Sequence, residues 1–170
     1  MILGTTSLYD CIVLAMTWYD WFKTGHVLVA VLWVGGGATL TLIALMTLRL
    51  QDPLRIAQFA HQAGMIGERL YTPMSLLTLL FGIGLMTNDQ SPWQWDYTWV
   101  RIALAGWTLT FLVGFFWIRP TAAKLGKVIA AKGPEDAETQ AIIKRILLVT
   151  RIDVIVLLFI VFDMTAKPWW

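Results

Sequence analysis

The chain has 170 residues, of which 58% are hydrophobic and 14% are charged, and its mean hydropathy is +0.66. Soluble domains are closer to half apolar and a quarter charged, so this composition indicates a membrane protein. A net charge of +2 gives no indication of nucleic-acid binding. The single cysteine, Cys11, excludes an internal disulfide and a cysteine-based metal site.

The N-terminal residues 1–17 are interpreted as an extension or an interfacial helix, ahead of one membrane domain formed by residues 18–170. Residues 1–17 lack the positively charged region and the small-residue cleavage site of a secretory signal. Their apolar run, residues 11–16, is too short to cross a bilayer.

Four apolar segments follow, and they set the expected fold. A helix needs about 20 mainly apolar residues to cross about 30 Å of hydrocarbon. The segments that meet or nearly meet this length are residues 22–48, 70–86, 97–118 and 146–164. They predict an all-α integral membrane protein with a four-helix antiparallel transmembrane bundle, surrounded by the lipid bilayer.

Two of the connections between these segments also have helical patterns. Residues 51–70 carry apolar side chains near helical spacing, which predicts an amphipathic helix on the cytoplasmic membrane surface. Residues 121–146 break at Gly133 and Pro134, after which Asp136 or a neighbour is expected to cap a helix that runs into the last span.

Basic residues and tryptophans predict the topology. Lys and Arg are concentrated in the first and third connections, so these connections are expected to face the cytoplasm and both termini to face outward. Seven of the ten tryptophans then fall at the outer interface, where indole rings are favoured: Trp18, Trp21, Trp93, Trp95, Trp99, Trp169 and Trp170.

His26 lies within the first apolar segment, on a helix face that also carries Trp33 and Gly37 at helical spacing. Small residues on this face let a neighbouring helix or a flat ligand approach closely. Three interpretations of His26 remain open. It is a packing histidine bonded to a carboxylate such as Asp163, an axial haem ligand, or a group in proton relay or metal binding. His61 lies in the cytoplasmic connection, too far away to be a second haem ligand.

Four other residues are expected at the depth of His26. Met86 and Met164 end the second and fourth spans, where each is either a second haem ligand or a packing residue. Arg101 and Asp163 lie about one turn inside the outer boundary. With His26 they would form a cluster that neutralises its own charges and meets a ligand carboxylate, unless Arg101 extends to the headgroups instead.

A second polar group is predicted near the cytoplasmic side. Arg151 and Asp153 are two positions apart, so they point to nearly opposite sides of one helix. Each therefore needs a partner on another helix, and Glu68 and Arg69 are the candidates. The group is either a structural polar lock or part of a proton or substrate path.

Three stretches carry a family resemblance: "WYDWFKTGHVLVAVLWVGGG", "IGERLYTPMSLLTLLFGIGL" and "WVRIALAG". They resemble an uncharacterised bacterial family of integral membrane proteins, a domain of unknown function. That family is similar to the copper-resistance D proteins and to the four-helix haem-synthesis protoporphyrinogen oxidases. The likeness covers most of the chain from about Trp18 onward.

The resemblance implies the same fold and a haem b ligand at His26, which matches a helix-one histidine of the haem-synthesis proteins. Their "RRLY" stretch and following proline resemble Arg69 to Pro73, with Glu68 in place of the first arginine. Arg101 corresponds to one of their lysines, but an arginine does not readily give up a proton. The resemblance therefore does not extend to oxidase activity. Copper transport is not implied either, because no cluster of Met, His or Cys converges on one site.

Two functional hypotheses follow. The first is a haem-b-associated redox or haem-handling membrane protein, with His26 as the axial ligand and Arg101 near a propionate. The second is a non-catalytic accessory subunit whose glycine-rich face packs against a larger membrane complex or another copy of the chain.

Overall fold

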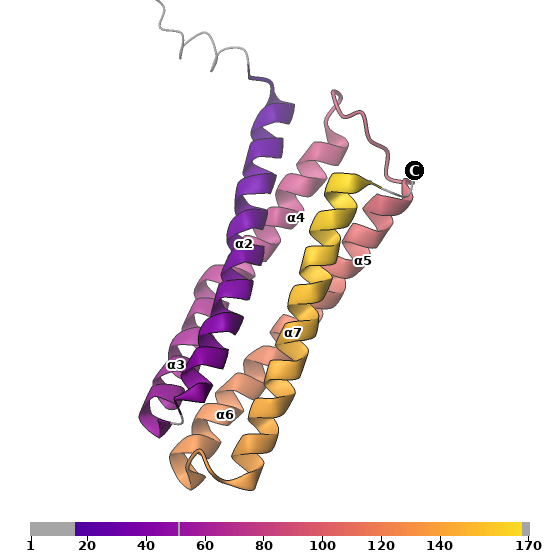
Figure 1. Cartoon of the computed structure of the whole chain (residues 1–170). Coiled ribbons are helices and arrows are strands. Elements are labelled where there is room, and N and C mark those ends of the chain that lie inside the picture. Colours follow the sequence, from indigo (N-terminus) through magenta and orange to yellow (C-terminus); the bar gives the residue numbers. More distant parts are fainter. Residues whose placement is uncertain (1–15, 51, 168–170) are drawn as a thin grey trace, which may run out of the picture.

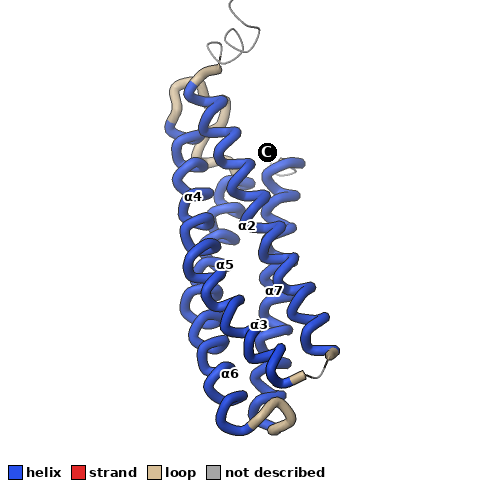
Figure 2. The backbone as a smooth tube through the Cα atoms, turned by 90° about the vertical axis from the view of Figure 1, so that its left-hand side faces the viewer, coloured by secondary structure: helices blue, strands red, loops and turns tan. Residues whose placement is uncertain are grey.

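The computed structural model describes residues 16–50 and 52–167. Within these ranges the chain is helical and contains no strand, and the connections lie at the two ends of the molecule (Figure 2). The predicted N-terminal extension lies almost entirely outside the described residues, as do Trp169 and Trp170.

The first helix, α2, spans Trp18–Arg49, which is about 48 Å at 1.5 Å per residue. Thr17 caps it: the main-chain N–H of Asp20 donates to Thr17 Oγ1, and the Thr17 N–H donates to the Asp20 carboxylate. This pair satisfies two N–H groups that a helix start otherwise leaves unbonded. The helix includes the whole of the predicted first span.

The next two helical runs are longer than predicted. Helix α3 (Pro53–Ile66) continues through a π-helical turn, η1 (Gly67–Tyr71), into α4 (Thr72–Thr87). In the same way α5 (Thr98–Leu112) continues through η2 (Val113–Ile118) into α6 (Arg119–Lys132). Residues 53–66 are helical, as predicted, but they continue into α4 and do not form a helix of their own. Their apolar face packs against α6 inside the protein, and Ile56 is buried there.

Both π-helical turns come just before a proline, Pro73 in α4 and Pro120 in α6. Proline has no N–H to donate, and its ring clashes with the carbonyl four residues earlier, so a wider turn relieves the conflict without breaking the helix. In each run a glycine lies six positions before the proline, Gly67 in η1 and Gly114 in η2.

The last helix, α7, spans Ala137–Ala166. It begins as predicted, because α6 ends before Gly133 and the Asp136 carboxylate accepts a hydrogen bond from the main-chain N–H of Glu138. Three helical runs are long and apolar enough to cross a membrane: Trp18–Arg49, Leu54–Thr87 and Thr98–Lys132. Helix α7 is not among them, and it carries three charged residues within its apolar part: Arg151, Asp153 and Asp163.

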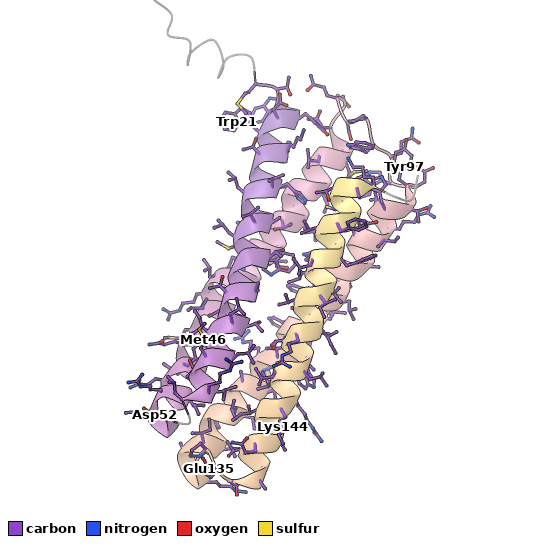
Figure 3. All side chains as sticks on the ribbon, in the orientation of Figure 1. Trp21, Met46, Asp52, Tyr97, Glu135 and Lys144 are labelled. Atoms are coloured by element: carbon purple, nitrogen blue, oxygen red, sulfur yellow. The ribbon has the colours of Figure 1, made fainter. Side chains whose placement is uncertain are left out.

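The long helices lie alongside one another (Figure 1), with α2 packed against α4 and α5 packed against α7. One end of the molecule, here called the tryptophan end, holds the start of α2, the 88–97 connection and the end of α7. The other, the basic end, holds α3, α6 and the start of α7. In Figure 3, Trp21 and Tyr97 mark the tryptophan end, and Asp52, Glu135 and Lys144 mark the basic end.

Two kinds of packing hold the helices together. At the basic end a cluster of buried aliphatic side chains joins α3, α6 and α7: Ile56, Leu125, Ile129, Ile142 and Ile143. Nearer the tryptophan end, glycines meet larger side chains. A Cβ added at Gly84 would lie 2.8 Å from the Phe22 ring, and one at Gly106 would lie 2.8 Å from Ile160. Glycine lets the helices approach closely at these points, where a larger residue would force the neighbouring side chain to move.

Candidate functional site

His26 of α2 is held against α4. Its Nδ1 lies 2.8 Å from the main-chain carbonyl oxygen of Thr78. Because a carbonyl oxygen can only accept, Nδ1 carries the proton and donates, and the lone pair remains on Nε2. A Cβ added at Gly82 would lie 3.2 Å from Cε1 of the imidazole, so this glycine leaves the room that the ring occupies.

Among the described residues, no hydrogen bond or ion pair joins His26, Arg101 and Asp163, which were predicted to form a cluster. His26 bonds to a main-chain oxygen and not to a carboxylate. Asp163 is fully buried, and within residues 16–50 and 52–167 neither of its carboxylate oxygens has a hydrogen-bond partner. Arg101 is exposed, and no described residue forms an ion pair with it.

The two methionines lie close to the ends of their helices. Met86 is half-buried and follows Gly82 by four residues, so it lies on the same face of α4, about 6 Å further toward the tryptophan end. Met164 is half-buried in the last turn of α7. Met86 is thus one helical turn beyond the imidazole.

A cavity of about 290 Å³ lies between the helices on the basic-end side of His26. Trp33 and Gly37 line it, but His26 does not. All three share one face of α2, and Trp33 follows His26 by seven residues, or about 10 Å. The predicted open space beside the glycines therefore exists, but it lies further along the helix than His26.

The three consecutive glycines, Gly35 to Gly37, have different surroundings. A Cβ added at Gly36 would lie 2.7 Å from the Tyr71 hydroxyl oxygen, so this glycine allows η1 to approach α2. Gly37 lines the cavity, and Gly35 is exposed with nothing close to it. Of the three glycines, Gly36 allows a close contact with another helical segment, and Gly37 has open space beside it in the cavity.

Both π-helical turns line the cavity, and an ion pair connects η1 to the first residue after η2. Glu68 in η1 accepts a hydrogen bond from Arg119, the first residue after η2, and both residues line the cavity. Their side chains are 57% and 43% exposed, so the pair lies at the cavity opening. π-helical turns are often found at functional sites.

A row of stacked side chains leads along α5 to this pair. Trp107 stacks on Phe111 with ring centroids 5.1 Å apart, Phe111 stacks on Phe115 at 5.9 Å, and the Arg119 guanidinium lies 5.4 Å from the Phe115 ring centroid. At its other end, Trp107 Nε1 donates to the main-chain oxygen of Ser75 at 3.1 Å. The row fixes one wall of the cavity.

The predicted polar partners are arranged differently from expectation. Glu68 pairs with Arg119 and not with Arg151, and both Arg69 and Arg151 are exposed. Asp153 is half-buried and lines the cavity. Arg151 and Asp153 do therefore differ in their surroundings, as their spacing on one helix implied.

A family model for predicted integral membrane proteins (DUF2269) matches residues 20–168. The chain belongs to this family. No curated protein and no solved structure gives a significant match. Among the described residues of this DUF2269 protein, no group of three or more His, Cys, Asp or Glu could hold a metal ion.

The sequence did not lead us to the residues that line the cavity near the two π-helical turns. Arg119, Ser75, Phe111 and Phe115 line the cavity and were not singled out. A signal was present, because the two runs share a glycine six residues before a proline. The four-residue spacing of Trp107, Phe111, Phe115 and Arg119 also places them on one helix face.

Proposed function

We propose that this DUF2269 protein crosses a bacterial inner membrane four times, with α7 as the fourth span and both termini outside. Helix α7 is about 45 Å long and exposes apolar side chains such as Ile155 and Phe162. Two of its charged residues face the protein: Asp153 lines the cavity and Asp163 is buried. This arrangement keeps both carboxylates out of lipid, as a spanning helix requires.

We further propose that the protein binds haem b through His26, in a redox or haem-handling role. The observation that carries this proposal is the hydrogen bond from Nδ1 to the Thr78 carbonyl. Histidines that bind metals usually donate their other ring N–H to a carbonyl or carboxylate, which fixes the ring and leaves the second nitrogen as the ligand. Haem needs only one imidazole, because the porphyrin supplies four nitrogens.

Other residues would complete such a site. Met86 lies one turn along the α4 face that holds the imidazole, and it would be a candidate for a second ligand to the haem iron. Arg101 is exposed and has no ion-pair partner among the described residues, so its guanidinium is free to bind a propionate. Bound haem would supply one-electron chemistry, and the Thr78 carbonyl would keep the imidazole in the ligating tautomer.

The experiment is an absorption spectrum of the detergent-purified protein, oxidised and then reduced, from cells supplied with a haem precursor. The wild-type protein is expected to show a Soret band, and His26→Gly is expected to lose it and regain it when imidazole is added. His61→Gly, at an exposed histidine of α3, is the matched control and should keep the band. A colourless wild-type protein, or a band that survives His26→Gly without imidazole, contradicts the proposal.

The second candidate function is a non-catalytic accessory subunit of a larger membrane complex or of a homo-oligomer. The observation that favours it is Gly35, which is exposed and has open space beside it. This role predicts a colourless protein that co-purifies with a membrane partner and loses it in Gly35→Leu. Gly37→Leu is less informative for this purpose, because Gly37 faces the internal cavity.

A further inference from the structure

The charges of the cavity between η1 and η2 do not balance. Of the charged residues that line it, Glu68 and Arg119 form an ion pair with each other. The third, Asp153, has no hydrogen bond or ion pair with any residue in the described ranges. A carboxylate among apolar walls is costly unless it meets a positive charge. The cavity as a whole therefore favours a cation.

A second polar group in this cavity also lacks a partner. Ser75 of α4 is only 3% exposed and lines the cavity, and its Oγ has no hydrogen-bond partner within the described part of the chain. Its main-chain oxygen, in contrast, accepts from Trp107. Buried hydroxyl groups are normally bonded, so this one indicates a missing polar neighbour.

The remaining lining is apolar and rich in aromatic rings. The aromatic side chains are Trp33, Phe59, Tyr71, Phe111 and Phe115. Cations are attracted to the faces of aromatic rings, and this attraction is strongest where water is excluded. A volume of about 290 Å³ is at the lower limit of small-molecule sites, which suits a ligand with on the order of ten non-hydrogen atoms.

We propose that this cavity is a binding site for a small lipophilic organic cation, an ammonium ion carrying an aromatic or alkyl group. The positive charge lies near Asp153, and the apolar group lies against the stacked rings of Phe111 and Phe115. The half-exposed Glu68–Arg119 pair marks the opening through which the ligand enters. The site is separate from the haem proposed at His26, which does not line this cavity.

The test measures binding of benzyltrimethylammonium to the purified protein, followed by calorimetry. The neutral control ligand is neopentylbenzene, in which a carbon replaces the charged nitrogen and the shape is kept. The wild-type protein is expected to bind the cation saturably and at least roughly tenfold more tightly than the neutral analogue. Equal affinity for the two ligands, or no saturable binding of the cation, overturns the proposal without any variant being needed.

Variants then assign the charge to one residue. Asp153→Asn is expected to weaken binding of the cation by roughly tenfold or more, and Asp153→Glu is expected to keep most of it. Asp163→Asn is the matched control, because it makes the same change on the same helix outside the cavity. Its affinity for benzyltrimethylammonium should equal that of the wild type. If Asp153→Asn binds as the wild type does, the assignment to Asp153 is wrong. Because haem absorbance is recorded on the same samples, failure here and failure at His26 are distinguishable.

Discussion

The basic end and the rest of the bundle differ in which side chains they bury and which they expose. At the basic end, aliphatic side chains from α3, α6 and α7 are buried, and Lys and Glu side chains lie outside them. Toward the tryptophan end, many large apolar side chains face outward. The interior there mixes apolar residues with polar ones: Trp99, Val100, Ala103, Leu157, Ser75, Thr78, Thr110 and Asp163. The first pattern is that of a water-soluble helix bundle and the second that of a bundle in lipid.

This difference shows which interactions hold each region together. In water, burial of aliphatic surface is worth about 25 cal/mol per Å², and this is the interaction that would stabilise a basic end outside the bilayer. In lipid, apolar side chains gain little from meeting one another, so close packing and hydrogen bonds between helices matter more. Gly106 packed against Ile160, and Trp107 bonded to the Ser75 carbonyl, are contacts of this second kind.

The largest expected effect comes from shortening an isoleucine at the basic end. Ile143→Ala, at a residue 6% exposed in the aliphatic cluster, should lower the free energy of unfolding by about 2–5 kcal/mol. Ile152→Ala is the matched control on the same helix, because Ile152 is 52% exposed, and it should change this energy by less than about 0.5 kcal/mol. Thermal unfolding in detergent, followed by circular dichroism, measures both. Similar losses of unfolding free energy in the two variants would contradict the proposed difference between the aliphatic cluster and the outward-facing apolar side chains.

A smaller effect is expected from the charged surface of the basic end. Glu138, in the first turn of α7 and ahead of the predicted fourth span at residues 146–164, accepts a hydrogen bond from Lys132 and pairs with Lys124, which lowers its pKa below the ordinary 4.5. Because the pKa is lower in the folded state, the stabilisation is complete above the ordinary value and is lost as the pH falls through the folded value. The effect is small because the pair is exposed.

The measurement is the unfolding midpoint of the wild type and of Glu138→Gln between pH 7 and pH 3. The variant should unfold at a lower temperature than the wild type at pH 7. The difference between the two unfolding midpoints should shrink toward zero as the pH falls to 3. Glu135→Gln, in the connection just before α7, is the control and should follow the wild type. A gap that stays constant over the whole range would show that Glu138 acts through packing and not through its charge.

Much of the fold could be predicted from the sequence. Apolar length located the long helices, and the break at Gly133 and the cap at Asp136 are confirmed. The continuity of α3 with α4 was not predicted, because Pro73 near the start of an apolar segment usually indicates a helix start. Only the structure shows that η1 absorbs this proline and carries the helix through it.

The candidate site was harder to predict from the sequence than the helices were. Helical spacing placed His26, Trp33 and Gly37 on one face correctly, but the partner of His26 is a main-chain carbonyl, which no side-chain pattern reveals. The pairing of Glu68 with Arg119 depends on how two helices far apart in the sequence align. Spacing within one helix gives no information on that alignment.

The contrast between the two regions is tested most directly on α7, which passes through both. In a Cys11→Ser background, Lys144→Cys and Ile155→Cys place single thiols at exposed positions eleven residues apart, or about 16 Å along the helix. Inside-out membrane vesicles are treated with a membrane-impermeant maleimide. The thiol at position 144 should react, and that at position 155 should react only after the membrane is dissolved. Equal labelling of both thiols in intact vesicles would contradict a lipid-embedded α7.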